Sequence, residues 1–560
     1  MKEWDRRLGM SRDISRRDFM NGVAIAVGAA LLPGCARDKE RELEAMSAYY
    51  PPAATGMRGA HPGSFEIAHA AVQGQRWTAG EADEHYDLVI VGAGISGLSA
   101  AYMYRRDVDS DDRILILDNH DDFGGHAKRN EFTLDGRTYL AYGGTMFMDA
   151  PDYYPEAARQ VIDEIGIELS TQNQTDYDAF YADYGGEQGV FFDGPTFGRN
   201  HFAGGGYFDA VGLQDAPIEE QVAAELVRLW ADEDDFLADY TPAEREQIID
   251  SHSWREYLSK YGGYSDATLA VLQKWSNGLW GIGIDALPAR GAYVVRYPGF
   301  NREPAPARDA ADKTVHRFSF PDGNASVARL LVRKMVPEAA PGNTMADSIT
   351  AKFDYDALDR LENSTRIRLS STAVHIQHQD GDLQGDVAVT YVKDGSAQQL
   401  TASKLIWAGY HAMLPHICPD IPLQQRESLG SCVRSPLVYT NVLVRNWRGF
   451  AEQNLRRAFC PGEFFHSVTF SHPVEMGDYR IARSPDQPMV LALQHVPLVP
   501  GLPAVEQFRA GRQALLETGF ETFERHIREQ LDRMLGSNGF DAAADIAGIT
   551  VNRWPHGYAY

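Results

Sequence analysis

The sequence predicts an α/β fold built on a parallel sheet, and three neighbouring features support this prediction. Residues 86–91 form an apolar run of the length that a buried parallel strand needs. Gly92, Gly94 and Gly97 follow in G-x-G-x-x-G spacing and lead into an Ala-rich helix start. A second apolar run, residues 114–117, ends in Asp118. Strand, glycines, helix, second strand and terminal acid in this order indicate a Rossmann-like dinucleotide-binding unit.

Each residue of this motif has a physical reason. Gly92 permits the tight turn, Gly94 lets the backbone approach a pyrophosphate, and Gly97 lets helix and strand pack closely. The N–H groups at the start of the helix attract the phosphate charge. Asp118 stands at the spacing where a carboxylate meets a ribose hydroxyl. Because a lone glycine pattern also ends ordinary strands, the prediction depends on the whole arrangement.

Two further glycine turns carry a resemblance. The doublet Gly124-Gly125 precedes His126, Lys128 and Arg129, and a second turn reads Gly143-Gly144-Thr145. Here the chain resembles the FAD-dependent amine oxidase superfamily. Residues 49–52, 61–66 and 553–558 narrow the resemblance to bacterial twin-arginine-exported flavoproteins of the spermidine dehydrogenase group.

The resemblance implies a bound FAD and names residues that would hold it. The family has Arg directly after the doublet, so His126 and Arg129 are both candidates for the cation that faces the phosphates. Ala373 and Val374 would reach the adenine through their backbone, and the turn at Ala408 would pass beside the cofactor. The residues that the resemblance places at the cofactor are Gly92, Gly94, Gly97, Asp118, Gly124, Gly125, His126, Arg129, Gly143, Gly144, Thr145, Ala373, Val374 and Ala408.

The remaining implications concern the active site. Trp554 and Tyr558 would be walls near the flavin, and Glu463 is a further catalytic candidate. The resemblance also implies a haem b, for which His61 and His69 are candidate ligands. Other side chains that could hold or deprotonate an amine are unranked: Asp149, Asp178, Asp183, Glu187, His466, His472, Tyr181, Tyr184, Phe464 and Phe465.

We expect a Rossmann-like FAD-binding domain of the amine oxidase type, interleaved with an α+β substrate domain. The predicted segments are a signal peptide (1–35), an N-terminal arm (36–82), the FAD-binding domain (83–150 and 311–410), the substrate domain (151–310 and 411–550) and a returning FAD-domain segment (551–560). Family relatives close the flavin site with a Gly-rich strand, turn and helix, which do not occur between Gly501 and Tyr560. The expectation is therefore a truncated chain with weak or absent flavin on purification.

Composition narrows the classes of function. The chain has 560 residues, a formal net charge of −25 and a pI of about 5.1, which argues against binding nucleic acid or an anionic membrane. The sequence has four cysteines and no C-x-x-C spacing, so no metal site is predicted. One disulfide among Cys418, Cys432 and Cys460 is compatible with the sequence.

The N-terminus predicts export. Arg16-Arg17 precede a short apolar stretch, residues 23–32, as in a twin-arginine signal. Residues 32–35 also match a lipoprotein box, which would make an acylated Cys35 the only membrane contact. The predicted location is the periplasm, and the predicted partners are the export machinery and a periplasmic electron acceptor.

The predicted function is FAD-dependent oxidation of the C–N bond of a polyamine such as spermidine, by hydride transfer to the flavin. Two alternatives remain open. One is a flavin-dependent desaturase or isomerase of an apolar substrate, because a fold does not fix a function. The other is an inactive, truncated flavoprotein scaffold.

Overall fold

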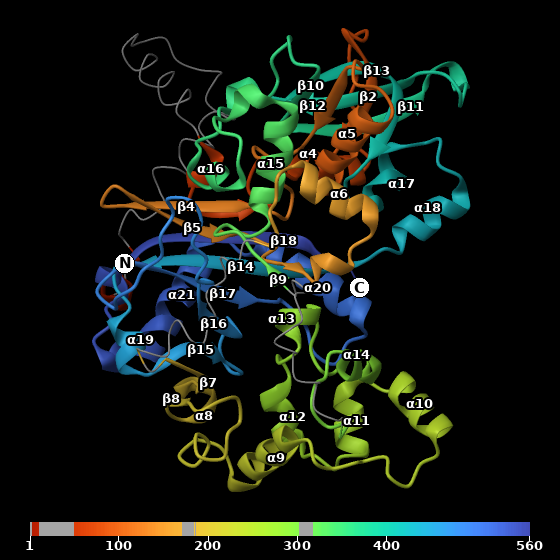
Figure 1. Cartoon of the computed structure of the whole chain (residues 1–560). Coiled ribbons are helices and arrows are strands. Elements are labelled where there is room, and N and C mark those ends of the chain that lie inside the picture. The colour runs from red at the N-terminus through yellow and green to blue at the C-terminus, as the bar shows by residue number, and fades with distance from the viewer. Residues whose placement is uncertain (1–2, 11–49, 171–183, 185, 302–316, 560) are drawn as a thin grey trace.

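The computed structural model describes residues 3–10, 50–170, 184, 186–301 and 317–559. The described chain forms two large β-sheets, of six and eight strands, and two two-stranded ones, with a group of helices beyond the eight-stranded sheet (Figure 1). The predicted signal peptide, including Arg16, Arg17 and Cys35, lies outside the described residues. Within the described part of the chain, no helix combines the length and apolarity needed to cross a bilayer.

A six-stranded sheet forms the nucleotide-binding unit and has the order β10-β3-β2-β13-β12-β11. Its strands are β2 (Glu84–Val91), β3 (Ile114–Leu117), β10 (Thr365–Arg368), β11 (Ser371–His378), β12 (Val387–Lys393) and β13 (Ser396–Trp407). The strands β10, β3, β2 and β13 run parallel, while β11 and β12 continue antiparallel. The predicted Rossmann-like α/β unit is confirmed, with α5 (Ile95–Asp107) and α15 (Ala325–Met335) in one apolar core with β2 and β3.

Residues 367–377, which read as one alternating strand, form two strands instead. Ser370 adopts a φ of 51° and breaks the run. β10 ends before it and pairs with β3 at one edge of the sheet. β11 begins after it and pairs with β12 at the other edge. A single positive φ thus sends the two halves of one apolar run to opposite edges of the sheet.

The second sheet has eight strands in the order β1-β18-β14-β17-β16-β15-β7-β8. Its strands are β1 (Gly56–Gly59), β7 (Glu187–Phe192), β8 (His201–Ala203), β14 (Arg434–Val444), β15 (Leu455–Phe459), β16 (Ser467–Phe470), β17 (Met489–His495) and β18 (Ile546–Ala559). Residues 551–559 therefore belong to this sheet, and their prediction as a returning segment of the FAD-binding domain is wrong. The predicted arm supplies β1, which pairs in parallel with β18.

Alternation along β14 and β18 gives the sheet two different faces. Tyr439 pairs with Asn552, and Leu437 pairs with Trp554, so these side chains share one face. That face meets the nucleotide-binding unit, because Trp554 hydrogen-bonds to Gly143. The intervening aliphatic residues, Val438, Val442, Ile549 and Val551, pack with α21 (Phe520–Leu535) on the other face.

The helices correct one predicted boundary and divide one long stretch. Residues 504–535 form two helices, α20 (Ala504–Glu517) and α21, because the chain turns at Thr518 and Gly519. α6 (Glu156–Glu164) packs its Val161 and Ile162 into the core of the nucleotide-binding unit, so that unit extends past residue 150.

The remaining elements complete the fold. They are α1 (Glu3–Arg7), α4 (Glu66–Val72), the hairpin β4 (Arg129–Leu134) and β5 (Arg137–Tyr142), β6 (Met148–Asp149), α8 (Gly194–Phe197), α9 (Glu220–Ala231), α10 (Pro242–Ser251), α11 (Trp254–Lys260), α12 (Asp266–Leu272), α13 (Asn277–Trp280), α14 (Ala289–Val294), β9 (Arg317–Phe318), α16 (Met345–Thr350), α17 (Leu414–Ile417), α18 (Leu423–Gly430), α19 (Arg448–Glu452) and α22 (Ala542–Asp545). Cys418, Cys432 and Cys460 are free thiols, so the structure forms no disulfide among them.

Candidate functional site

The glycine turn after β2 forms one side of the candidate site. Gly92 has a φ of 113°, a conformation that favours glycine. A Cβ on Gly97 would stand 1.9 Å from the carbonyl oxygen of Gly92, so only glycine lets α5 begin this close to β2. Gly94 is the N-cap of α5, no side chain caps this helix, and its first turn contains no acid. The first N–H groups of α5 are therefore available to an anion.

The doublet Gly124-Gly125 forms the opposite side of the same cradle. The N–H of Gly124 donates to the carbonyl of Ala93 at 2.8 Å, which holds the two turns together. A Cβ on Gly94 would meet Gly125 Cα at 3.7 Å, an ordinary contact distance. Two turns without side chains thus face each other at an uncapped helix N-terminus, an arrangement that fits a pyrophosphate.

Asp118 lies at the ribose end of this cradle. Its side chain is 6% exposed and accepts hydrogen bonds from the N–H of Ala93 at 2.7 Å and of His120 at 2.8 Å. Although burial raises the pKa of Asp118, the hydrogen bonds and charge of His120 hold it below the usual value. Asp118 is therefore ionised, and its oxygens retain lone pairs that fit a ribose hydroxyl.

The other predicted backbone contacts lie close to the cradle. The N–H of Ala408 donates to Val91 at 2.8 Å, and a Cβ on Gly92 would come within 2.8 Å of the Ala408 oxygen. The start of β11 reaches Asp118, because the N–H of Ser371 donates to the Asp118 carbonyl at 2.7 Å. A bulge between Ala373 and His375 leaves Val374 outside the pairing register with β12. The placement fits the adenine contact predicted for this strand.

The cations that follow the doublet do not face the cradle. Arg129 is buried and donates to Asp322 at 2.9 Å and to the carbonyl of Ile349 at 2.6 Å. Lys128 is buried as well and donates to the carbonyl of Asp122 at 2.8 Å. The prediction that Arg129 binds the cofactor is therefore wrong. His126 stays beside the cradle, and burial lowers the pKa of its imidazole to about 4, so it is neutral there.

The turn Gly143-Gly144-Thr145 joins the nucleotide-binding unit to the second sheet. The indole N–H of Trp554 donates to the Gly143 carbonyl at 2.7 Å, and its ring lies 4.7 Å from that of His126. The N–H of Thr145 donates to the backbone carbonyl oxygen of His126 at 3.3 Å. A Cβ on Gly144 would stand 2.1 Å from that oxygen. Trp554 thus lies against the glycine turn and His126, where the resemblance places a wall of the flavin site.

A tyrosine pair extends this wall, and one of its members was not predicted. The hydroxyls of Tyr439 and Tyr558 lie 2.9 Å apart, and the Tyr558 hydroxyl donates to the carbonyl of Gly278 at 3.0 Å. Tyr142 meets the Tyr439 ring edge to face at 6.0 Å. The alternation of side chains along β14 could have indicated Tyr439, because it puts this tyrosine and the polar Asn441 on one face of the strand.

Three buried amides join the hairpin of β4 and β5 to the second sheet behind this wall, and none was predicted. Asn441 and Asn552 each donate to Asn130 Oδ1 at 2.7 Å. Asn441 also donates to the carbonyl of Tyr142 at 2.8 Å, and Asn552 to that of Tyr439 at 3.1 Å. The amides therefore fix the tyrosines relative to the glycine turn.

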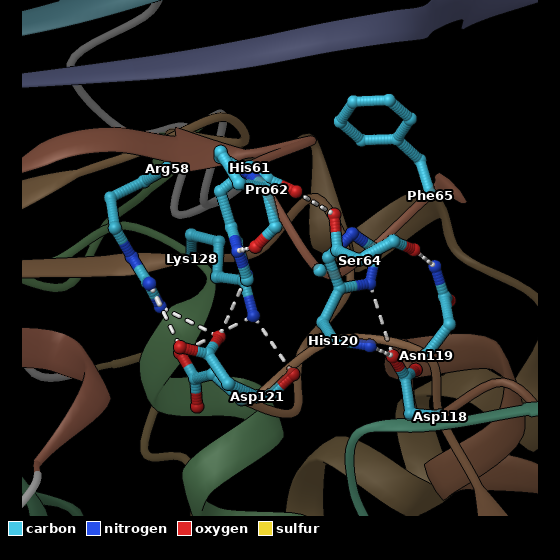
Figure 2. A network of polar contacts seen from close by, with 12 residues as sticks. Arg58, His61, Pro62, Ser64, Phe65, Asp118, Asn119, His120, Asp121 and Lys128 are labelled. Carbon is cyan, nitrogen blue, oxygen red and sulfur yellow. Dashed lines mark hydrogen bonds and ion pairs between the residues drawn. The ribbon is translucent and has the colours of Figure 1, made fainter. Parts of the chain in front are cut away.

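The segment after β1 braces the loop that follows β3, as Figure 2 shows. Arg58 donates to both oxygens of Asp121, at 2.8 and 2.9 Å, and His61 Nε2 lies 3.1 Å from the same carboxylate. Asn119 donates to the carbonyl of Ser64. Because His61 Nδ1 also lies 2.8 Å from the carbonyl of Pro62, both nitrogens of this predicted haem ligand are engaged. The ring of His69 packs against Phe65 at 5.1 Å.

Glu463 is buried and pairs with Arg533 of α21. Both of its oxygens accept hydrogen bonds from Arg533 of α21, at 2.7 and 2.6 Å, beside a pocket of about 560 Å³. Phe464, stacked on His495 at 3.8 Å, lines the same pocket. This carboxylate is engaged in an ion pair on the α21 side of the sheet, and the catalytic role of Glu463 stays a prediction.

The other unranked candidates are scattered. Asp149 is exposed and pairs with Arg317, Glu187 accepts from the N–H of Gly205, and Tyr184 packs on Trp447. His466 and Phe465 are buried in the second sheet, and His472 packs on Phe147. Asp178, Tyr181 and Asp183 lie outside the described residues.

The comparisons with known proteins agree with a nucleotide-binding unit. Residues 90–165 match the family model described as NAD(P)-binding Rossmann-like domain. Similar solved structures include putrescine oxidase bound to putrescine (16% identity, 85% of this chain and 87% of that chain, TM-score 0.47) and cyclohexylamine oxidase from Brevibacterium oxydans IH-35A (16%, 84% and 84%, 0.46). A CLA-producing fatty acid isomerase from P. acnes is also similar (15%, 84% and 86%, 0.42). Because these TM-scores are below 0.5, the argument for function depends on the site.

Proposed function

We propose that this chain binds FAD and oxidises an amine, with a polyamine such as spermidine as its substrate. The observation that carries the proposal is the contact between the cradle and the second sheet, where the ring of His126, the residue after the glycine doublet, lies 4.7 Å from that of Trp554. The glycine cradle and Asp118 lie on one side of this contact, and Trp554 with the Tyr439–Tyr558 pair lies on the other. The motif resemblance to flavin amine oxidases supports the choice of FAD and of an amine.

FAD would supply a hydride acceptor when bound. The chain's own groups would bind and orient the substrate. The tyrosine pair offers aromatic faces and two hydroxyls, which suit the methylenes and nitrogens of an alkyl amine. Their hydroxyl contact and the bond to Gly278 hold the rings in place. The substrate nitrogen must be unprotonated before its adjacent carbon gives up hydride.

The test is anaerobic reduction of the FAD-loaded protein by a panel of amines. We expect spermidine and other diamines or triamines to bleach the flavin absorbance, with a rate that rises with pH as the reacting nitrogen loses its proton. Monoamines that reduce the flavin equally well would remove the polyamine part of the proposal. If no amine reduces a protein that holds flavin, the desaturase or isomerase alternative replaces it.

Substitutions at the tyrosine pair connect this test to the structure. Tyr439→Phe and Tyr558→Phe each remove one hydroxyl and keep the ring. We expect slower reduction by spermidine with unchanged FAD binding, because neither hydroxyl contacts the cradle. Tyr293→Phe, in α14, is a matched control that should leave both quantities unchanged. Equal reduction rates in all three variants would contradict the assignment of this wall to the substrate.

The location and partners are part of the same proposal. Residues 15–20 and the apolar stretch after them favour twin-arginine export to the periplasm, where the electron acceptor would be a periplasmic partner. This route exports proteins that have already folded, which suits a protein loaded with FAD before export.

A further inference from the structure

An arginine and a tyrosine lie together beside the cradle. Arg434, the first residue of β14, lies with its Cζ 5.9 Å from the centre of the Tyr410 ring. Arg512 belongs to α20, which packs against β14. Burial raises the pKa of Tyr410, and the charges of Arg434 and Arg512 both oppose that rise. Tyr410 follows the Ala408-Gly409 turn of the cradle, and its hydroxyl lies 3.3 Å from His126 Nε2. The pair of Arg434 and Tyr410 therefore adjoins the doublet through His126.

Arg512 is a charged residue on the side of α20 that packs against the rest of the protein. Phe508 and Leu515, four residues before it and three after it, are buried, so Arg512 shares the stripe of α20 that packs inward. Burial lowers the pKa of its guanidinium. A charged group on the inward stripe of a helix is costly unless an opposite charge or an acceptor meets it.

Among the described residues, no carboxylate or carbonyl accepts a hydrogen bond from the side chain of Arg434 or Arg512. Their histidine neighbours add no charge, because burial lowers the pKa of His126 to about 4 and that of His556 to about 3. The charge of Asp118 also acts on Tyr410. Guanidinium groups without an ion-pair partner among the described residues favour a bound anion.

The glycine cradle would hold a negatively charged diphosphate, but the cations of its own loop point elsewhere. A pyrophosphate is dianionic, and the nearest cations in its own loop, Lys128 and Arg129, are directed inward to Asp122 and Asp322. The helix N-terminus supplies only a partial positive charge. Arg434 of the second sheet adjoins His126, the residue after the doublet, through Tyr410, and Arg512 lies on the helix that packs against the same strand.

We propose that Arg434 and Arg512 form the cationic side of the pyrophosphate site, supplied by the second sheet and α20. This inference rests on the proposed function, because the diphosphate is that of the bound FAD. Guanidinium groups suit this role, since they bind phosphate oxygens through paired N–H donors. The site would then close only when the two sheets are assembled.

The test separates the phosphate contribution from the rest of the cofactor. ADP and adenosine share the ribose that Asp118 would bind, and only ADP carries the diphosphate. Titration calorimetry of both ligands is done on the wild-type protein, Arg434→Gln, Arg512→Gln and the control Arg509→Gln. Arg509 is an exposed residue of the same helix. We expect each site variant to bind ADP about 10- to 100-fold more weakly, the loss for a hydrogen bond to a charged group, with adenosine affinity and the control unchanged.

Three results would overturn the inference: unchanged ADP affinity in both site variants, an equal loss of ADP and adenosine affinity, or an equal loss in Arg509→Gln. Failure of the proposed function looks different. If the wild-type protein binds inorganic pyrophosphate and ADP through these arginines yet never binds FAD, the flavin proposal fails and the anion site stands.

Discussion

Gly94→Ala separates cofactor binding from folding. Gly94 has a φ of −70° and a ψ of 174°, a conformation that alanine adopts without strain. The new Cβ would meet only Gly125, at 3.7 Å and 4.0 Å, so the protein without cofactor can accept it. Replacing glycine where the backbone is compatible stabilises a protein by about 0.4–1 kcal/mol. We therefore expect an unchanged or slightly higher Tm without cofactor.

The affinity for FAD should fall in Gly94→Ala, even though the Tm without cofactor does not. The Cβ occupies the space between the two glycine turns, where the phosphate would approach the N–H groups of α5. Losing one such hydrogen bond to a charged group costs about 1.5–3 kcal/mol, which weakens FAD binding about 10- to 150-fold. The measurement is quenching of FAD fluorescence on titration with the protein, beside a thermal melt of each variant. Gly94→Val, with its larger side chain, should abolish retention.

Gly97→Ala is the matched control for this reasoning. Its Cβ would stand 1.9 Å from the Gly92 oxygen, so α5 must move away from β2, at a cost of about 1–3 kcal/mol. This variant should lose thermal stability with and without cofactor. The reasoning is refuted if Gly94→Ala binds FAD as tightly as the wild type, or if its Tm without cofactor falls as far as that of Gly97→Ala.

Further predictions concern the buried amides, the ion pair between Arg58 and Asp121, and export. Asn441→Leu leaves Asn130 with one donor fewer, and urea unfolding should show a loss of about 1–3 kcal/mol, whereas an unchanged midpoint would show that the amides add no stability. Asp121→Asn should cost about 3 kcal/mol at neutral pH, because it breaks a buried ion pair. Against the effect of burial, its cationic partners hold the pKa of Asp121 well below the usual value, so this stability is complete above about pH 4 and is lost as pH falls further. Unfolding free energies of wild type and variant that run parallel from pH 7 to pH 3 would contradict it. Replacing Arg16 and Arg17 with Lys should prevent periplasmic accumulation, and normal export would rule out the twin-arginine route.

The cradle could be predicted from the sequence because its determinants are local. Gly92, Gly94, Gly97 and Asp118 belong to one strand-helix-strand unit, and their spacing fixes their geometry. Arg129 was misplaced because its partner, Asp322, is 193 residues away along the chain. No local pattern shows that this guanidinium turns inward.

The wall opposite the cradle was only partly predictable for the same reason. Trp554 and Tyr558 were found through resemblance, whereas Tyr439 comes from another strand that pairs with theirs. The position of residues 551–559 depends on strand order, which a period-two pattern does not contain. The register of β14 against β18 is what brings these side chains together.

The most direct test of the central claim is a titration of the purified protein with FAD, followed by anaerobic spermidine. The account predicts saturable binding, with bands near about 370 and 450 nm as for any oxidised flavin, and bleaching of the 450 nm band by the amine. Saturating FAD is used so that the binding site is fully occupied. Absence of saturable binding, in a protein whose thermal melt shows that it is folded, would contradict the account.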